Sequence, residues 1–185
     1  MTITLEKLKD KLIQRERPKL LLDLDGVVIE YNFQKIVKDF FGVDLTKYQI
    51  YAYDLADVLG VAPMMINTMF KEQVFGKPNF VENSMEVLNE LSPRYDIYIF
   101  SNRLKYMSYY ELAMWLDEYD IPYDSIDETG SGNYFAHIDD SPAKLMSTNS
   151  LVKLLFNQPW NKSCWNITNR LKRVDSWEQI RKGLI

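Results

Sequence analysis

Residues 19–28 of this 185-residue chain read KLLLDLDGVV, and they are the clearest indication of its fold. The run Lys19–Leu24 is short and almost continuously apolar, which is typical of a parallel strand covered on both faces. The pattern ends at Asp25-Gly26, a pair that favours a turn. We therefore expect a buried strand whose carboxyl end carries two acidic side chains, Asp23 and Asp25.

Further apolar stretches have the same character, and helical patterns separate them. The other expected strands are residues 96–100, 134–138, 151–156 and a short stretch around Val174. Helical spacing of apolar residues occurs at residues 3–15, 84–91 and 106–119, and in a C-terminal segment that Ser176 could cap. Strands that alternate with helices predict an α/β fold, with a Rossmann-like parallel sheet of about five strands and helices on both faces.

Residues 31–80 do not follow this alternation. They contain aromatic and Met-rich amphipathic stretches at 33–41 and 63–75, without a convincing strand. We interpret them as a small helical cap inserted after the first strand. Residues 1–30 and 81–185 would then form the core domain.

Composition limits the class of ligand and the location. The formal net charge is -4, which disfavours binding of polymeric nucleic acid because no basic groove is expected to follow its backbone. A single cysteine, Cys164, excludes an intramolecular disulfide framework. The chain has no apolar run long enough to span a membrane, and its charged N-terminus does not look like a signal peptide. We expect a cytoplasmic protein that acts on a small molecule, and the sequence leaves a homodimer open.

Three polar clusters each follow one of the expected strands, at residues 23–27, 101–105 and 139–142. The carboxyl ends of neighbouring strands in an open parallel sheet converge on one crevice, so four aspartates should meet there. Carboxylates so close repel one another unless a cation neutralises them, and hard oxygen ligands suit Mg²⁺. Each cluster alone is also typical of a turn or a helix start. Their joint occurrence in this order favours a site.

This charge balance predicts phosphoryl chemistry. One aspartate can attack phosphorus and form an aspartyl-phosphate. A second aspartate two residues later can protonate the leaving group and then activate the hydrolytic water. Ser101 and Asn102 can donate hydrogen bonds to phosphoryl oxygens, and a Lys or Arg can balance the charge of the transition state. His137, the single histidine, lies inside an expected strand, and we interpret it as structural.

These clusters resemble the motifs of the haloacid-dehalogenase-like phosphatase superfamily. DLDGV at 23–27 is similar to the first motif, FSN at 100–102 to the second, and IDD at 138–140 to the fourth. The resemblance extends to the type-C 5'(3')-deoxyribonucleotidases. It covers residues 19–182, through a phosphate loop, a helix that carries Trp115, and a late strand, loop and terminal helix; it is weakest in the cap.

The resemblance implies a role for each acidic residue. Asp23 is the nucleophile, and Asp25 is the general acid and base. Asp23, the backbone carbonyl of Asp25, and Asp140 hold Mg²⁺. Asp139 lies nearby, either behind these ligands or joined to the metal through a water molecule.

Basic and aromatic positions follow from the same resemblance, with one departure from the family pattern. Tyr31 falls where an aromatic ring stacks on the nucleobase, and Lys105 falls where a lysine contacts phosphate. The third motif is a lysine before the Asp pair, but residues 106–138 contain no lysine. Lys105, Lys144 or Arg103 could supply its charge as a phosphate-binding residue, and we favour Lys144.

Together these features predict a Mg²⁺-dependent phosphomonoesterase that hydrolyses nucleoside monophosphates, with deoxyribonucleotides favoured, through an aspartyl-phosphate. Two alternatives stay open. One is a phosphatase of the same superfamily for another small phosphometabolite or for a 3'-phosphate at a nucleic-acid end. The other is a catalytically degenerate nucleotide-binding module, which only the missing third-motif lysine supports.

Overall fold

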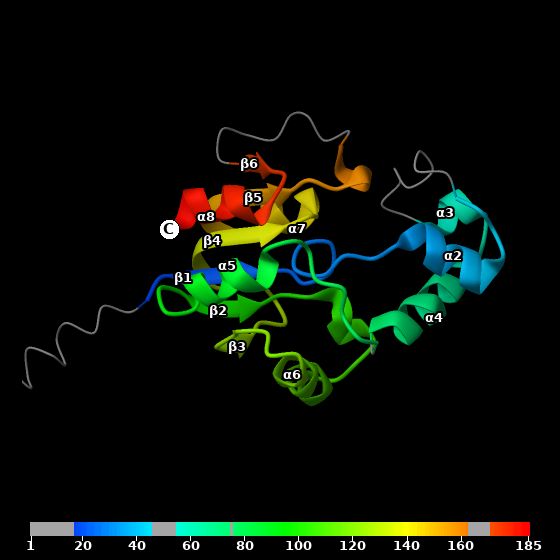
Figure 1. Ribbon diagram of the computed structural model, residues 1–185, viewed down its shortest axis with the longest axis horizontal. Coiled ribbons are helices and arrows are strands. Elements are labelled where there is room, and N and C mark those ends of the chain that lie inside the picture. Colours follow the sequence, from blue (N-terminus) through cyan, green and yellow to red (C-terminus); the bar gives the residue numbers. More distant parts are fainter. Residues whose placement is uncertain (1–16, 46–54, 75, 163–170) are drawn as a thin grey trace, which may run out of the picture.

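A six-stranded parallel sheet forms the centre of the computed structural model, which describes residues 17–45, 55–74, 76–162 and 171–185 (Figure 1). Its strands are β1 (Lys19–Leu22), β2 (Asp96–Ile99), β3 (Ser125–Ile126), β4 (Asn133–Asp139), β5 (Asn149–Phe156) and β6 (Leu171–Val174). Their order across the sheet is β3-β2-β1-β4-β5-β6, so the predicted α/β class and parallel sheet are confirmed. The sequence reading omitted β3, an edge strand of two residues that is too short to give an apolar run.

The first strand lies in the middle of the sheet. Leu22 of β1 pairs with Ile99 of β2 on one side and with Ile138 of β4 on the other. Leu20, Leu21 and Leu22 are fully buried, because a central parallel strand is covered on both faces. The residues that follow β1, β2 and β4 therefore emerge side by side at one edge of the sheet.

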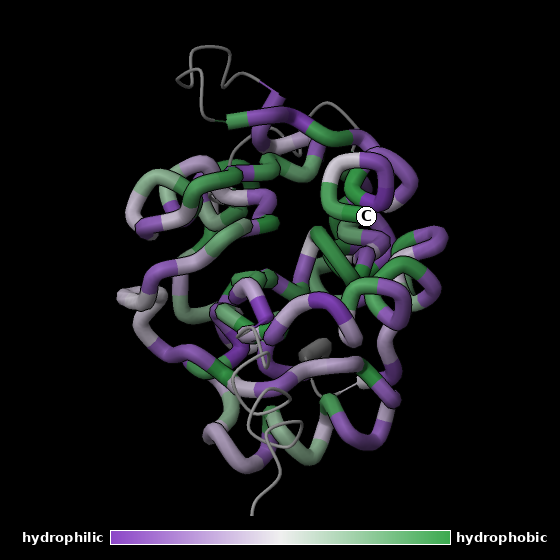
Figure 2. Tube along the Cα trace, turned by 90° about the vertical axis from the view of Figure 1, so that its left-hand side faces the viewer, coloured by the Kyte–Doolittle hydropathy of each residue, from purple (hydrophilic) through white to green (hydrophobic). Residues whose placement is uncertain are grey.

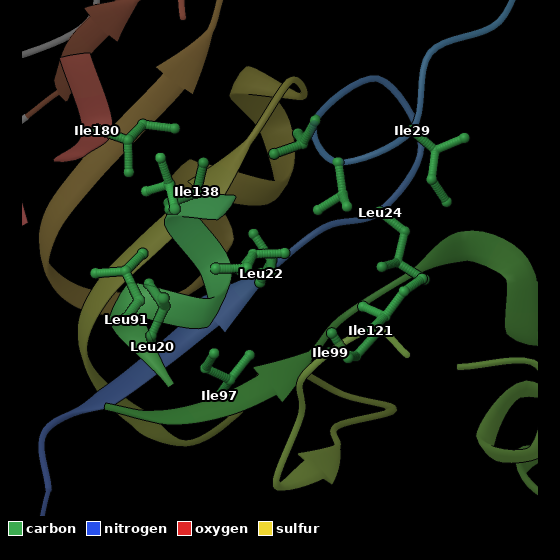
Figure 3. Packing of buried hydrophobic residues seen from close by; sticks show 14 of the residues in the cluster. Leu20, Leu22, Leu24, Ile29, Leu91, Ile97, Ile99, Ile121, Ile138 and Ile180 are labelled. Carbon is green, nitrogen blue, oxygen red and sulfur yellow. The ribbon is translucent and has the colours of Figure 1, made fainter. Parts of the chain in front are cut away.

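Helices cover both faces of the sheet. Helices α5 (Ser84–Leu91), α6 (Tyr109–Glu118) and α8 (Trp177–Leu184) share one hydrophobic cluster with Leu20 and Leu22. Figure 3 shows Leu91 of α5 beside Leu20, and Ile180 of α8 beside Ile138 of the neighbouring strand β4. Leu21 points to the opposite face, because successive side chains of a strand alternate. Helix α7 (Pro142–Ser147) packs on β4 and β5. It lies on that second face, where its Lys144 approaches Asp139 and where Thr148 bonds to His137, the register partner of Leu21.

Two helix starts differ from the sequence expectation. Helix α6 begins at Tyr109 rather than 106, because Ser108 and Glu111 form a reciprocal capping box. The short 3₁₀ helix η1 (Asn102–Lys105) precedes it. Ser176 occupies the N-cap position of α8, but its side chain makes no capping hydrogen bond. The expected helix at residues 3–15 and Cys164 lie outside the described residues.

Residues between β1 and α5 form a separate group of helices. They are α2 (Phe33–Phe41), α3 (Leu55–Leu59) and α4 (Pro63–Val74), which Figure 1 shows together beyond one edge of the sheet. Their buried side chains make a second hydrophobic cluster. The chain leaves and re-enters the core side by side, because Ile29 and Phe80 form an antiparallel bridge. We propose on this basis that residues 31–80 act as a cap on the core.

No helix in the described part of the chain has the length and apolar character needed to cross a bilayer. Along the trace, hydrophobic stretches are short and hydrophilic residues interrupt them (Figure 2).

Leu20→Ala tests the packing of the central strand. The substitution leaves a cavity against α5, and we expect a loss of about 2–5 kcal/mol in the free energy of unfolding. Leu151→Ala is the matched control, since Leu151 is also in a strand but is 74% exposed; it should change stability by no more than about 0.5 kcal/mol. Urea unfolding monitored by circular dichroism measures both. Equal losses would contradict the assignment of Leu20 to the core.

Candidate active site

The polar residues predicted from three separate clusters lie together at the carboxyl edge of the sheet. Asp23 directly follows β1, and its backbone N–H donates to the Ile138 carbonyl of β4 at 3.0 Å. Asp139 ends β4 and Asp140 follows it, while Ser101 follows β2. All four of these polar side chains are at most 7% exposed. The register of three neighbouring strands therefore brings residues of all three polar clusters to one edge of the sheet.

Asp23, Asp139 and Asp140 form a cluster of buried carboxylates. Each offers one oxygen, and these oxygens lie within 4.8 Å of one another. The Lys144 ammonium of α7 donates to Asp23 Oδ2 at 3.0 Å and lies 3.6 Å from Asp139 Oδ2. Lys144 thus pairs with two of the three carboxylates, and its single positive charge leaves two negative charges on this group of described side chains when all three acids are ionised.

Burial raises the pKa of all three acids, and repulsion from neighbouring carboxylates raises the pKa of Asp23 and Asp140 further. Burial, followed by the neighbouring Asp139 carboxylate, raises the pKa of Asp23 well above its usual range. Burial also raises the pKa of Asp139 to about 6, although Lys144 opposes this shift. The pKa of Asp140 is raised well above its usual range by burial and by the Asp23 and Asp139 carboxylates. A divalent cation would remove this repulsion, and a set of carboxylate oxygens with a residual charge of two fits Mg²⁺.

A loop after β5 holds Asp140 in place. Trp160 Nε1 donates to Asp140 Oδ2 at 2.8 Å, and Asn161 Nδ2 donates to the Asp140 backbone carbonyl at 2.8 Å. Both residues belong to the short helix η2 (Pro159–Asn161). The sequence analysis assigned them no role in the site, and only the family resemblance, through its late loop, pointed to this segment.

The turn after β1 requires a glycine. Gly26 has a backbone φ of +83°, and a Cβ at this position would collide with Asp140 Oδ2. Its carbonyl accepts a hydrogen bond from Gln158 Nε2 at 2.6 Å. Gly26 therefore allows the turn after Asp25 to lie close to the Asp140 side chain.

Asp25 has a different set of partners from the carboxylate cluster. Its carboxylate accepts hydrogen bonds from the Arg103 guanidinium, at 2.9 Å from Nη2, and from the Tyr31 hydroxyl at 2.6 Å. Burial by itself would lower the pKa of Arg103, but the Asp25 carboxylate outweighs it and the pKa is raised. Burial and Asp25 also raise the pKa of Tyr31. The structure thus places Arg103, which was predicted to bind phosphate, against the Asp25 carboxylate. A phosphate contact of Arg103 stays a prediction.

The other predicted phosphate ligands lie on η1. Ser101 is buried, and its hydroxyl oxygen accepts from the Arg103 backbone N–H at 3.2 Å. Asn102 and Lys105 are exposed, and within the described residues their side chains have no recorded contact with the carboxylate cluster. Their phosphate-binding roles stay predictions.

His137 lies behind the cluster. It is fully buried, its Nδ1 is 2.8 Å from Thr148 Oγ1, and its Nε2 is 3.3 Å from Asp139 Oδ2. Burial, together with the Lys144 and Lys153 ammoniums, lowers the pKa of His137 to about 3, so the ring is neutral. His137 therefore lies behind Asp139 as a neutral, fully buried ring.

A pocket of about 420 Å³ borders the Gly26 turn and the start of the cap. Three aromatic rings line it: the Phe33 ring lies 5.7 Å from the Tyr31 ring and 5.2 Å, edge to face, from the Trp160 ring. Polar side chains, among them Asn79 and Gln158, complete the lining. Tyr31, predicted to stack on a nucleobase, therefore lines a pocket with its ring while its hydroxyl is bonded to Asp25.

Comparisons with known proteins agree with this geometry. The model of the family described as "5' nucleotidase, deoxy (Pyrimidine), cytosolic type C protein" matches residues 17–185. A curated 5'(3')-deoxyribonucleotidase of Bacillus subtilis is 30% identical over 118 residues, as is one of Bacillus phage SPbeta. The match covers 60% of this chain and 66% of each relative, slightly less than two thirds of its length.

Solved structures share the fold at low sequence identity. A haloacid-dehalogenase-like hydrolase of Streptococcus pneumoniae superposes with a TM-score of 0.52 at 13% identity, covering 76% of this chain and 85% of its own. The HAD-hydrolase YfnB of Bacillus subtilis, whose structure is magnesium-bound, gives 0.53 at 12% identity, covering 92% of this chain and 99% of its own. These neighbours identify the core as the haloacid-dehalogenase-like fold.

Gly26→Ala tests the close approach at the turn. Gly60 is the matched control because it also has a positive φ, +63°, but a Cβ there meets nothing within 4 Å. Both variants should lose about 1 kcal/mol of unfolding free energy from backbone strain, and Gly26→Ala should lose more because of the collision with Asp140. Urea unfolding of the two variants checks this difference, and equal losses would contradict it.

Proposed function

This chain belongs to the cytosolic type C family of deoxy-5'-nucleotidases, and we propose that it is a Mg²⁺-dependent phosphomonoesterase of nucleoside monophosphates, with deoxyribonucleotides favoured. The observation that carries the proposal is the buried Asp23 carboxylate, held by Lys144 beside Asp139 and Asp140. The curated relatives of Bacillus subtilis and its phage favour the deoxyribonucleotide over other phosphate esters.

Asp23 is the proposed nucleophile. A carboxylate oxygen of Asp23 attacks phosphorus, the bond from phosphorus to the ester oxygen breaks, and an aspartyl-phosphate forms. The Lys144 ammonium, 3.0 Å from Asp23 Oδ2, holds the nucleophile and balances the negative charge that collects at phosphorus. The Ser101 hydroxyl would donate a hydrogen bond to a phosphoryl oxygen. Lys144 thus supplies the charge of the third-motif lysine that residues 106–138 lack.

Asp25 is the proposed general acid and base. It gives a proton to the departing ester oxygen, so that the product leaves as an alcohol. It then removes a proton from the water that attacks phosphorus, which breaks the bond to Asp23 and releases inorganic phosphate. Its separate partners, Arg103 and Tyr31, keep it out of the carboxylate cluster.

Mg²⁺ would be held by Asp23, Asp140 and the backbone carbonyl of Asp25, with Asp139 beside them. When bound, it would shield the charge of the incoming phosphate. The residual charge of the cluster supports this assignment, as does the buried Asp139 Oδ2, for which the described part of the chain offers no hydrogen-bond donor.

The aromatic pocket supports a nucleoside as the rest of the substrate. The Tyr31 ring would stack on the base, and the polar side chains around it could meet the base edges. The net charge of -4 favours a mononucleotide over a polymer. We propose a cytosolic location in line with the family description; a homodimer stays a prediction.

Asp23→Asn should abolish turnover without unfolding the protein, because an amide cannot act as the nucleophile. Phosphate release from a panel of 5'- and 3'-nucleoside monophosphates, with Mg²⁺ or with a chelator, measures this. Asp44→Asn is the control, since Asp44 is exposed on the cap. Mg²⁺-independent turnover would contradict the metal assignment. Nucleotide binding without hydrolysis by the wild type would favour a binding module, and preference for 3'-phosphorylated oligonucleotides would favour an end-processing phosphatase.

Lys144→Met separates the candidates for the third-motif lysine. We expect kcat to fall by about 100-fold or more, because the variant loses the charge beside Asp23. Lys105→Met should act mainly on KM if Lys105 contacts the bound phosphate. Lys172→Met, on the exposed part of β6, is the control. Steady-state kinetics with one nucleotide measures all three variants. A larger loss of kcat for Lys105→Met than for Lys144→Met would contradict the assignment.

A further inference from the structure

Asp25 is held by a buried guanidinium and a half-buried phenol that the proposed mechanism does not use directly. We propose that Arg103 and Tyr31 are positioning residues that fix the orientation of the Asp25 carboxyl group for its proton transfers. The inference rests on the proposed function only in taking Asp25 as the general acid. It reassigns Arg103 from the phosphate to the acid.

Arg103 is buried in the core. Its side chain is 1% exposed, and its guanidinium carbon lies 3.9 Å from the centre of the Trp115 ring. Nε and Nη2 point at Asp25, and Nη2 also donates to the Tyr31 hydroxyl at 2.8 Å. A planar guanidinium stacked on an indole has little freedom to turn. It can therefore fix the orientation of the carboxylate that it binds.

Tyr31 completes the arrangement from the other side. Its hydroxyl donates a hydrogen bond to Asp25 Oδ1 and accepts one from Arg103 Nη2. Tyr31, Arg103 and Asp25 are therefore all bonded to one another. Tyr31 is also two residues before helix α2. The segment that leads into the cap thus reaches the acid directly.

The two oxygens of Asp25 are not equivalent in this network. Oδ1 accepts from the Tyr31 hydroxyl at 2.6 Å, from Arg103 Nη2 at 2.9 Å and from Arg103 Nε at 3.1 Å. Among the described residues, Oδ2 has the shared Nε contact alone, also at 3.1 Å. The network therefore fixes the carboxyl group mainly through Oδ1 and leaves Oδ2 with fewer hydrogen bonds. In the proposed mechanism, a proton moves from the Asp25 carboxyl group to the ester oxygen as the bond from phosphorus breaks.

The first test uses the leaving group. The values of kcat/KM are compared for phenyl phosphate, which needs a proton on its departing oxygen, and for p-nitrophenyl phosphate, which needs it far less. Arg103→Met should lower kcat/KM for phenyl phosphate by about 100-fold and the value for p-nitrophenyl phosphate by much less. Tyr31→Phe should show the same pattern more weakly, and Arg103→Lys should recover part of the loss. Arg94→Met, at an exposed arginine, is the control.

The second test is a double-mutant cycle with Asp25→Asn. If Arg103 acts through Asp25, adding Arg103→Met to Asp25→Asn should cause no further loss beyond about twofold. The proposal is overturned if the losses in kcat/KM of the two single variants multiply in the double variant. It is also overturned if Arg103→Met raises KM equally for both esters, since either result would mean that Arg103 contacts the phosphate. A fold check by circular dichroism accompanies each variant, and Arg103→Lys carries the test if Arg103→Met does not fold. Wild-type activity on both aryl esters but on no nucleotide would contradict the proposed substrate and leave this comparison intact; no hydrolysis of either ester would overturn both.

Discussion

Three buried carboxylates within 4.8 Å of one another constrain everything around them. Asp23, Asp139 and Asp140 can remain ionised together only if positive charge and hydrogen-bond donors surround them, because water is largely excluded. Lys144, the Trp160 indole and the backbone N–H of Ser141 meet part of this need. The charge that remains is the reason why a divalent cation fits the site.

Two aspartates that are separated by a single leucine have unrelated surroundings. Asp23 faces the carboxylate cluster and an ammonium, whereas Asp25 faces a buried guanidinium and a phenol. The Gly26 turn makes this separation possible, since it bends the chain directly after Asp25 and leaves room for Asp140. Different environments are what would allow two identical side chains to take the proposed roles of nucleophile and acid.

Several features could be predicted from the sequence because they depend on local pattern. The apolar run Lys19–Leu24 predicted a buried parallel strand, and the acidic pairs at its end and after β4 predicted that carboxylates meet at the sheet edge. Other features could not be predicted in this way. The short strand β3 has no pattern of its own, and the position of Trp160 over Asp140 joins residues that are 20 apart in the chain.

The sequence by itself determined the α/β class, the order of the strands along the chain and the acidic residues that meet at the edge of the sheet. These follow from apolar periodicity and from the rule that parallel strands share a carboxyl edge. Only the tertiary structure decided the partners of the charged groups. It brought Lys144 to Asp23 across 121 residues and Arg103 to Asp25 across 78. The physical reason is that an ion pair in the core depends on distance and burial in space, and neither quantity is encoded in local sequence spacing.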